Sequence, residues 1–482
     1  MSLGTIFWII TIAMCGVFLW ISLKFKDEAG SSFANYAIGA GSFPIYLIFA
    51  TQFATIMGVG NFIGHAGSGY SQGLAWLPFI LGEQGSKVLF ALVFAGIAGK
   101  FTYNTVAEMA DDLFVRDKWT RALAGLLASC VMIAWVGGQG KAFGNIFNVA
   151  TGADPIWVII FFSAVFILYT TLGGIYSVAY TDLIQGILVL VFGTTFYIMA
   201  FQPVNWSFAE IGVRLTEMGK AELWSTESVS GLSAFSKFVT ASVGVLSAQI
   251  YWQRCFAAKD AKTARNGLLF SGVVAVIMVM LTALVGMVIY TMNPNLSPDD
   301  AMPWMMMTYM PVWLSAMIFT LILAAGMSSA DSNLNSAAVL IVNDLVKPFR
   351  PDLKDKDLVK LATWFTVIIG VFACVAALTA SSILGLFSKA YAMTGGGLIP
   401  LILVGFLWKE RKNEPFEMGK KNSKVTPWGA RVGIISGAVL TQIPALGSNA
   451  VLIALVVSAV LIVIVSSVTG TTSASTPESI NQ

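Results

Sequence analysis

Long apolar runs without charge dominate this sequence and restrict what it can fold into. Several exceed the roughly 18 residues that mark a membrane-spanning helix, among them residues 4–23 and 449–467. Hydrophobic residues make up 57% of the chain and charged residues 11%, against about 25% charged in ordinary globular domains. Since only helices and closed barrels satisfy their backbone hydrogen bonds in lipid, the length of these runs predicts an all-α polytopic membrane protein.

About thirteen transmembrane helices are expected in a single domain over residues 1–467. The spans are placed near residues 4–23, 44–69, 74–98, 121–149, 155–172, 180–201, 235–253, 266–291, 312–345, 361–380, 383–408, 429–445 and 449–467. The first has no basic segment before its apolar stretch, so we interpret it as a retained span and not a signal peptide. Residues 468–482 are rich in Ser and Thr and are expected to form a disordered cytoplasmic tail.

Basic residues concentrate in one set of the loops between these spans. If the N-terminus lies outside, most of the 28 Lys and Arg residues fall in cytoplasmic segments, and Arg254 is counted with them. Outside segments hold Arg214, Lys220 and Lys237. The positive-inside rule therefore predicts an outside N-terminus and a cytoplasmic C-terminus.

Two spans contain glycine clusters that a plain membrane anchor does not need. In the second span, Gly58, Gly60 and Asn61 lie about halfway across, and a helix opened at that depth survives only where it is buried or lines a cavity. We predict that this helix is unwound there. The eleventh span carries Gly395–Gly397 followed by Pro400, for which we predict a hinge.

The ninth span is unusually polar over Ser328–Ser336. Polar groups at this depth are expensive in a membrane and mark functional sites. At 1.5 Å per residue, Met57 and Ser329 fall at similar depths, roughly 20 Å from the inner face. Opened-helix carbonyls facing hydroxyls make an oxygen-only site, which suits a hard monovalent cation such as sodium.

Four stretches of the chain carry a resemblance to a known family. They are Phe62–Gly64 with Gly67–Leu74, Gly173–Gly174 with Thr181–Gln185, Tyr251–Arg254, and Ala324–Ser336. In these stretches the sequence resembles bacterial members of the sodium/solute symporter family, which carry solutes such as proline, sugars, sialic acid and pantothenate. Because the stretches spread over spans two to nine in the family's order, the resemblance covers most of the chain.

The resemblance implies a fold, an activity and a location. The fold is a leucine-transporter-like 5+5 inverted repeat, with spans 2–6 over residues 44–201 and spans 7–11 over residues 235–408, and with extra helices at 4–23, 429–445 and 449–467. The activity is sodium-coupled symport of a small solute by alternating access. The expected location is a bacterial cytoplasmic (inner) membrane.

The resemblance also implies ion sites. Carried over by position, the sodium ligands are the carbonyls of Ala54, Met57 and Ala325 and the hydroxyls of Ser328 and Ser329. Asp182 matches an aspartate on the family's sodium exit path, and with Asp331 and Ser332 it could form a second sodium site, as in some members. From the residues alone, Asp182 with Thr181 could instead cap the sixth span.

The substrate is the least determined part of this interpretation. Sugar-carrying relatives place Gln at the position of Asn61 and Glu at that of Ile80, and these departures disfavour a sugar. Gly58 and Gly60 could present backbone N–H groups to a carboxylate. With Gln249 also expected at the substrate site, this pattern favours an amino acid or a small organic acid.

Two ionisable residues near the expected site have competing interpretations. Glu83 could bind a substrate amine, but Lys87 follows at the four-residue spacing of an ordinary helical ion pair, and that pairing is favoured. His65, the one histidine in the chain, could relay protons or donate to a substrate. A plain hydrogen bond in an outer vestibule is the favoured interpretation of this histidine.

Three functions remain open at this point. Sodium symport is the main hypothesis; a transporter-like solute sensor and a proton-coupled carrier on the same fold, using Asp182 and Asp331, are the alternatives. An enzyme is not expected, because no loop carries a nucleophile–base pair, metal motif or phosphate loop. The expected partners are a small-molecule substrate, sodium and the lipid bilayer, with no nucleic acid, and the expected state is a monomer.

Overall fold

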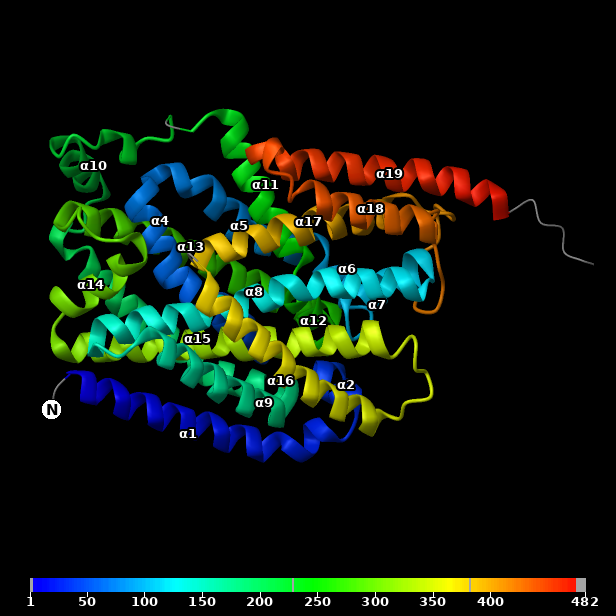
Figure 1. The fold of residues 1–482 in the computed structure, drawn as a ribbon, viewed down its shortest axis with the longest axis horizontal. Helices are drawn as coiled ribbons and strands as arrows, with labels where there is room; N and C mark the ends of the chain where they lie inside the picture. Colours follow the sequence, from blue (N-terminus) through cyan, green and yellow to red (C-terminus); the bar gives the residue numbers. More distant parts are fainter. Residues whose placement is uncertain (1–2, 228, 381–382, 474–482) are drawn as a thin grey trace, which may run out of the picture.

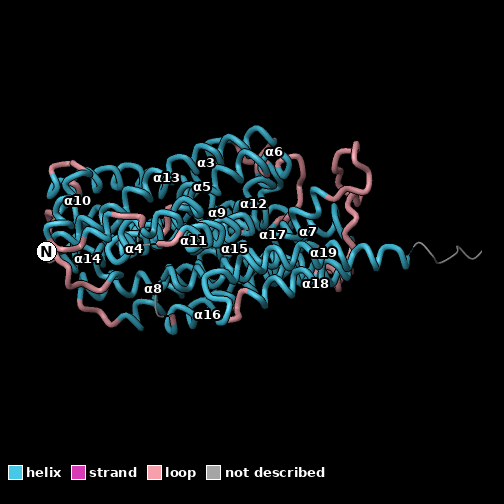
Figure 2. The backbone as a smooth tube through the Cα atoms, turned by 90° about the horizontal axis from the view of Figure 1, so that it is seen from above, coloured by secondary structure: helices cyan, strands magenta, loops and turns pink. Residues whose placement is uncertain are grey.

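The protein forms a bundle of long helices that run roughly along one axis (Figure 1). The computed structural model describes residues 3–227, 229–380 and 383–473. Within these ranges it contains no β-strand, only two isolated bridges. The N-terminus lies at one end of the bundle and the end of the last helix at the other (Figure 2). The prediction of an all-α polytopic membrane protein is confirmed.

Nineteen α-helices are present among the described residues. They are α1 (Leu3–Gly30), α2 (Phe33–Ile38), α3 (Ile45–Ile56), α4 (His65–Gln72), α5 (Leu77–Val93), α6 (Ala95–Ala98), α7 (Val106–Ala110), α8 (Lys118–Thr151), α9 (Pro155–Ala200), α10 (Phe208–Glu217), α11 (Gly231–Ser247), α12 (Gln249–Ala257), α13 (Ala261–Met292), α14 (Ala301–Thr308), α15 (Val312–Leu340), α16 (Asp355–Thr379), α17 (Ile383–Leu407), α18 (Pro427–Leu440) and α19 (Ala450–Ser473). Short 3-10 and π-helical turns join several of them.

Eight of the described helices are long and apolar enough to cross a membrane, or ten if each of two bent helix pairs counts as one span. The thirteen expected spans differ from this number mainly because single long segments hold two spans each. The bent pair over residues 45–93 covers the expected second and third spans, α9 covers the fifth and sixth, and the 14-residue α18 is short for a span.

Helix α9 folds back on itself at Gly174. Its 46 residues would reach about 69 Å as a straight helix, more than twice the bilayer core. Gly174 has φ 50° and ψ −153°, a conformation open to glycine. The Tyr169 hydroxyl bonds the Met327 carbonyl, and Asp182 bonds Ser328. Neighbouring residues of α15 therefore contact both halves of α9, which would be about 20 Å apart in a straight helix.

Two helices are broken in the middle of the bundle. The axis bends by 51° between α3 and the segment that starts at Gly60, and by 40° between α11 and α12. The first break, at Met57 and Gly58, confirms the predicted unwinding of the second span. The second break, at Ala248 (φ −74°, ψ 122°), was not predicted. A broken first helix in each half is the arrangement expected of an inverted repeat with a central site.

The structure shows a continuous helix where a hinge is predicted in the eleventh span. Helix α17 continues through Gly395–Gly397 and Pro400. Its glycines serve close packing: a Cβ on Gly396 would lie 3.0 Å from the Gly437 carbonyl of α18, and one on Gly397 would lie 2.8 Å from the Ile434 carbonyl. Small residues at such contacts let membrane helices approach closely.

The chain end differs from the expectation over a short stretch. Helix α19 continues to Ser473, so residues 468–473 of the expected tail are helical. Residues 474–482 of the expected tail lie outside the described residues.

Candidate functional site

The break in the second span exposes backbone groups that side chains then satisfy. The Thr55 carbonyl accepts a hydrogen bond from the Ser329 hydroxyl at 2.6 Å. The Val59 N–H donates to Gln139 Oε1 at 2.9 Å, and Asn61 Nδ2 donates to the Ile56 carbonyl. Buried backbone groups need partners, so polar side chains from α15 and α8 hold this helix open.

The two segments expected to face each other, the broken second span and the polar ninth span, do lie together. A Cβ on Gly58 would be 2.9 Å from the Ser329 Cβ and 3.1 Å from Gln139 Oε1, so the broken helix and α15 touch at this point. The predicted ligand residues Ala54, Met57, Ala325 and Ser328 are fully buried. Ser329 is 3% exposed, at the boundary between this region and a cavity.

Asp182 lies inside the second half of α9 and is fully buried. Its carboxylate accepts from the Thr51 hydroxyl at 2.5 Å and from the Ser328 hydroxyl. The interpretation of Asp182 as a helix cap is therefore wrong, because its oxygens bond α3 and α15 and not the start of its own helix. The structure instead places Asp182 against one of the predicted sodium ligands.

Arg254 is the largest departure from the expected topology. We counted it with the cytoplasmic basic residues, but it is 1% exposed. One of its terminal nitrogens donates to Ser332 at 2.8 Å and to the hydroxyls of Thr51 and Thr55 at 3.1 and 3.2 Å. The same nitrogen lies 4.0 Å from Asp182. A buried charge is stable only beside a counter-charge, and the Asp182 carboxylate supplies one for this inward-facing guanidinium.

Asp331 is the remaining member of the expected second sodium site. It is fully buried, and neither of its carboxylate oxygens has a hydrogen-bond partner among the described residues. Tyr169 faces it but donates to the Met327 carbonyl at 3.1 Å. Asp182 and Ser332 are thus joined through Arg254, whereas Asp331 keeps two free oxygens beside them.

The donor set of this region consists of oxygen atoms. The described residues contain no group of three or more His, Cys, Asp or Glu side chains that could hold a metal ion. Hydroxyls, carbonyls and carboxylates match the ligand preference of hard cations. An oxygen-only donor set is what the predicted sodium ion requires, and its predicted ligands Ala54, Met57, Ala325, Ser328 and Ser329 supply oxygen atoms alone.

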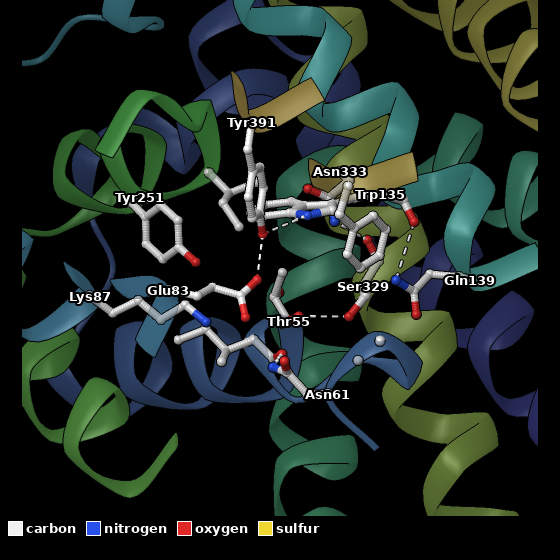
Figure 3. Close-up of a pocket in the computed structure, with 15 residues that line it drawn as sticks. Thr55, Asn61, Glu83, Lys87, Trp135, Gln139, Tyr251, Ser329, Asn333 and Tyr391 are labelled. Atoms are coloured by element: carbon white, nitrogen blue, oxygen red, sulfur yellow. Dashed lines mark hydrogen bonds between the residues drawn. The ribbon is translucent and has the colours of Figure 1, made fainter. Parts of the chain in front are cut away.

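A small cavity, with about 30 Å³ of space for the centres of water molecules, lies beside these residues in the middle of the bundle (Figure 3). It is lined by Thr55, Ile56, Gly58, Gly60, Asn61, Glu83, Lys87, Trp135, Gln139, Ile250, Tyr251, Ser329, Asn333, Phe387 and Tyr391. Thr55 and Ser329 therefore belong both to the cavity and to the predicted ion region. Of the predicted substrate residues, Gly58, Gly60, Asn61 and Glu83 line the cavity.

Gln249, the fifth predicted substrate residue, is not part of this cavity. Its amide accepts from the Val106 N–H at 2.9 Å and donates to the Asn104 carbonyl at 3.0 Å. It therefore fixes the start of α12 to the loop before α7. The broken helix turns at Ala248, so the residues that follow, Ile250 and Tyr251, face the cavity instead.

Glu83 is held by three donors. The Tyr391 hydroxyl donates to Oε1 at 2.6 Å, while His65 Nε2 and Gln84 Nε2 each lie 2.8 Å from Oε2. Trp76 Nε1 donates to His65 Nδ1 at 3.1 Å, so His65 Nε2 carries the proton that Glu83 accepts. The predicted hydrogen bond of His65 is present, but the side chain is fully buried and does not line an open vestibule.

The favoured ion pair between Glu83 and Lys87 is not a direct contact, although the two opposite charges attract each other across one helical turn. No carboxylate of the described residues lies within 4.0 Å of the Lys87 nitrogen, and its hydrogen bond goes to Gln84 Oε1 at 2.5 Å. Lys87 is 5% exposed and lines the cavity. Figure 3 shows the Glu83 and Lys87 side chains both directed into the same space.

Several cavity residues were missed from the sequence. Trp135 Nε1 donates to the Tyr391 hydroxyl at 3.0 Å, and Gln139 and Asn333 also face the cavity. The tryptophan and tyrosine lie in spans whose composition does not distinguish them from packing aromatics. Gln139, a polar residue in mid-span, was a usable signal by the rule applied to the ninth span.

Comparison with known proteins finds relatives whose names give several different substrates. The chain is 26% identical to the high-affinity choline transporter 1 of Drosophila melanogaster, over 82% of this chain but 65% of that protein's length. It is 26% identical to the sodium/glucose cotransporter of Vibrio parahaemolyticus, covering 89% and 82% of the two chains. The sodium/pantothenate symporter of Haemophilus influenzae is 24% identical, with 80% and 81% covered.

Solved structures show the same fold. A sodium-coupled sialic acid symporter in a substrate-bound outward-open state superposes with a TM-score of 0.80 at 21% identity, covering 97% of this chain and 98% of that one. Mhp1, a nucleobase-cation-symport-1 family transporter, gives 0.58 at 16% identity, covering 90% and 95%. The leucine-transporter-like fold expected from the sequence is confirmed.

The family model for the sodium:solute symporter family matches residues 36–415. That range contains the broken second and seventh spans, the cluster around Asp182 and Arg254, and the whole cavity lining. Sodium is the coupling ion that the family and the sodium-coupled structural neighbour support. The chain belongs to the sodium:solute symporter family.

Proposed function

We propose that this transporter imports a small organic solute, an amino acid or a small organic acid, together with sodium by alternating access. The family and the fold are those of secondary transporters, which are not enzymes. The proposed sodium ligands are the carbonyls of Ala54, Met57 and Ala325 with the hydroxyls of Ser328 and Ser329. The substrate binds in the cavity next to them.

The observation that carries this proposal is the position of Ser329 between the two sites. Its hydroxyl contacts the Thr55 carbonyl of the broken helix, and the same residue lines the cavity. A sodium ion bound to a lone pair of this hydroxyl leaves its O–H donating to the Thr55 carbonyl, so the ion would add to the contact that holds α3 against α15. Sodium binding and the shape of the substrate cavity are thereby linked through one side chain. Such a link between two sites is the source of the coupling free energy that symport requires.

The cluster of Asp182, Asp331 and Ser332 supports a second role for the same region. Thr51 and Ser328 connect Asp182 to both faces of the proposed sodium site. We propose that Asp182 receives the ion on its way to the cytoplasm, and that the free oxygens of Asp331 contribute to a second sodium position. The inward sodium gradient sets the direction of transport, and the proposed topology places the N-terminus outside and the C-terminus in the cytoplasm.

Purified protein in proteoliposomes tests the proposal directly. Uptake of labelled solutes is measured with an inward sodium gradient, with equal sodium on both sides, and with a proton gradient alone. The solute panel includes choline, glucose, pantothenate and sialic acid, the solutes that appear in the names of the similar proteins. It also includes amino acids and small organic acids. Accumulation that follows the sodium gradient supports symport, whereas accumulation that follows only the proton gradient supports the proton-coupled alternative.

Thermal unfolding with and without sodium separates a transporter from a sensor. A ligand that binds the folded state raises its unfolding temperature by mass action, so binding appears in both cases. Binding without any net uptake would favour the transporter-like sensor and contradict the proposal. A synergistic stabilisation by sodium and one solute, combined with uptake, is the expected result.

A further inference from the structure

We infer that a cleft at the cytoplasmic end of α17, α18 and α19 binds the phosphate headgroup of an anionic phospholipid. Figure 1 shows α18 and α19 side by side at one edge of the bundle, with the loop that follows α17 at the end of α18. The cleft is lined by parts of this loop (residues 408–426), by the start of α18 and by the end of α19. These residues are separate from those of the central cavity, so lipid binding there does not depend on the transported solute.

The cleft has room for a headgroup and lies where the membrane surface is expected. It holds about 710 Å³ of space for the centres of water molecules, within the roughly 300–1,000 Å³ of small-molecule sites. Trp408 and Trp428 both line it, and tryptophan is enriched where a spanning helix meets the headgroup layer. With the C-terminus in the cytoplasm, as proposed, the cleft faces the leaflet that carries anionic lipids.

Lys424 is a cation of the cleft without a protein partner. Among the described residues, no carboxylate lies within 4.0 Å of its ammonium and no group accepts a hydrogen bond from it. Its side chain is exposed and lines the cleft. All three of its N–H donors are therefore available to the oxygens of a phosphate, to which lysine binds as a point charge.

Lys421 supplies a second cation whose charge is only partly compensated. Its ammonium donates to the Val425 carbonyl at 2.8 Å, which leaves two further N–H donors. Glu410 lines the same cleft and attracts this ammonium, but burial lowers the pKa of Lys421 more than that attraction raises it. An added anion would stabilise a charged lysine in this environment. The cleft thus sets two lysines against one glutamate.

The loop around the cleft is basic as well. Residues 408–431 include seven Lys or Arg and three Glu side chains. Two of these glutamates are already paired, Glu414 with Arg411 at 2.9 Å and Glu417 with Lys420 at 2.6 Å. The first turn of α18 also lines the cleft, and the N-terminus of a helix attracts phosphate. Basic pockets between helices at the cytoplasmic surface are suited to anionic headgroups.

The apolar faces of α18 and α19 indicate a lipid and not a soluble phosphate. By helical spacing, Ile435 and Val439 share a face of α18 with Trp428, and both are more than half exposed. On α19, Val463 lies one turn before Ser467, which lines the cleft, and it is also exposed. Exposed apolar surface of this kind marks contact with the membrane. A lipid with its headgroup in the cleft can therefore lay its acyl chains along these two helices.

Two phospholipids that differ in headgroup charge test the inference on the unaltered protein. The full chain in detergent is titrated with dioleoyl phosphatidylglycerol or with dioleoyl phosphatidylcholine, and its unfolding temperature is followed, because a ligand of the folded state raises it. We expect phosphatidylglycerol to stabilise the protein at a lower concentration than phosphatidylcholine. Equal effects of the two lipids would overturn the inference. A shift of the same size with inorganic phosphate alone would overturn the assignment to a lipid.

Two variants of opposite charge change assign the effect to the cleft. Lys421→Gln combined with Lys424→Gln should weaken phosphatidylglycerol binding about 10- to 30-fold, at roughly fivefold for each lysine near an anionic lipid. Glu410→Gln should strengthen binding about two- to fivefold, which a misfolded variant would not do. Lys356→Gln combined with Lys360→Gln is the matched control. Both are exposed lysines in the first turns of α16, and the affinity should be unchanged.

The outcomes separate a lipid site from a general effect of charge and from the proposed function. Equal losses in the two double variants would assign the effect to overall charge and overturn the site. Weaker binding by Glu410→Gln would contradict the role of the lysine charges. Uptake that ignores the sodium gradient would remove the proposed symport but leave the lipid titration as it stands, so the two failures are distinguishable.

Discussion

The hydroxyl of Ser329 in α15 donates a 2.6 Å hydrogen bond to the carbonyl of Thr55 in α3. In an unbroken helix that carbonyl would accept from the N–H of Val59, which here donates to Gln139 instead. One helical hydrogen bond is thus replaced by two side-chain bonds from α15 and α8. One of the two side chains that hold the broken helix in place, Ser329, is also a proposed sodium ligand.

The serine pair gives the first prediction. Ser328→Ala combined with Ser329→Ala removes two oxygen ligands from the proposed site, so the sodium concentration for half-maximal uptake should rise at least tenfold. It is measured as initial uptake rate against sodium concentration at fixed solute. Ser163→Ala is the control, because Ser163 is a buried serine in α9 without a hydrogen-bond partner among the described residues. An unchanged sodium dependence in the double variant would refute the assignment.

Gly58 gives the second prediction. A Cβ at this position would lie 2.9 Å from the Ser329 Cβ and 3.1 Å from Gln139 Oε1, so Gly58→Ala must push α15 or α8 away from the broken helix. We expect a loss of transport of at least tenfold, with the protein still inserted and folded. Gly85→Ala in α5 meets no atom within 4 Å and should retain activity. Equal activities of the two alanine variants would contradict the proposed close contact.

Arg254 gives the third prediction. Replacing it with Gln leaves the buried carboxylate of Asp182 without the guanidinium that lies 4.0 Å away. Breaking a buried pair from one side typically costs about 3–5 kcal/mol, so the variant should unfold at a clearly lower temperature in detergent. Adding Asp182→Asn should restore part of the loss, as a double-mutant cycle measures. Additive losses would show that the two charges do not interact.

Asp117 gives a prediction on pH dependence. Burial raises the pKa of this carboxyl, but hydrogen bonds from Arg431 and Thr120 outweigh burial and lower the pKa below its ordinary value. The stabilisation is therefore fully present above the unfolded pKa of about 3.9 and is lost as the pH falls through the folded value. Asp117 caps α8 and contacts Arg431 of α18 at 2.6 Å.

Asp117→Asn isolates the charge, because Asn caps a helix about as well as Asp. At pH 7 the substitution should lower the free energy of unfolding by up to about 1 kcal/mol, the range of partly exposed pairs. The difference between variant and parent should shrink below pH 4 in thermal unfolding scans. A difference that is the same at both pH values would assign the effect to packing and not to charge.

The second and ninth spans show how much of the site could be predicted from local sequence. Hydropathy placed both, the paired glycines Gly58 and Gly60 marked the break, and the polar run at Ser328–Ser336 marked its partner. These features were readable because the membrane forbids open backbone and polar groups, so each violation is conspicuous in the sequence. For the same reason the equal depth of Met57 and Ser329 was calculable from helix rise alone.

The seventh and eleventh spans show where local sequence failed. Glycines in the eleventh span suggested a hinge but serve close packing against α18, while the actual second break falls at Ala248, which has no local signature. Whether a glycine opens a helix or admits a neighbour depends on what lies beside it. That information is carried by the packing of segments far apart in the chain.

The apolar runs by themselves determined that this chain is a helical membrane protein, and the motifs determined its family. Tertiary structure alone decided the partners of the charged groups: Arg254 turns inward to Asp182, Glu83 bonds His65 and Tyr391, and Lys87 is left facing the cavity. Sequence spacing could not give these pairings. In a low-dielectric interior a charged group interacts most strongly with the nearest counter-charge or donor. The distance to that group is set by helices that come together only on folding.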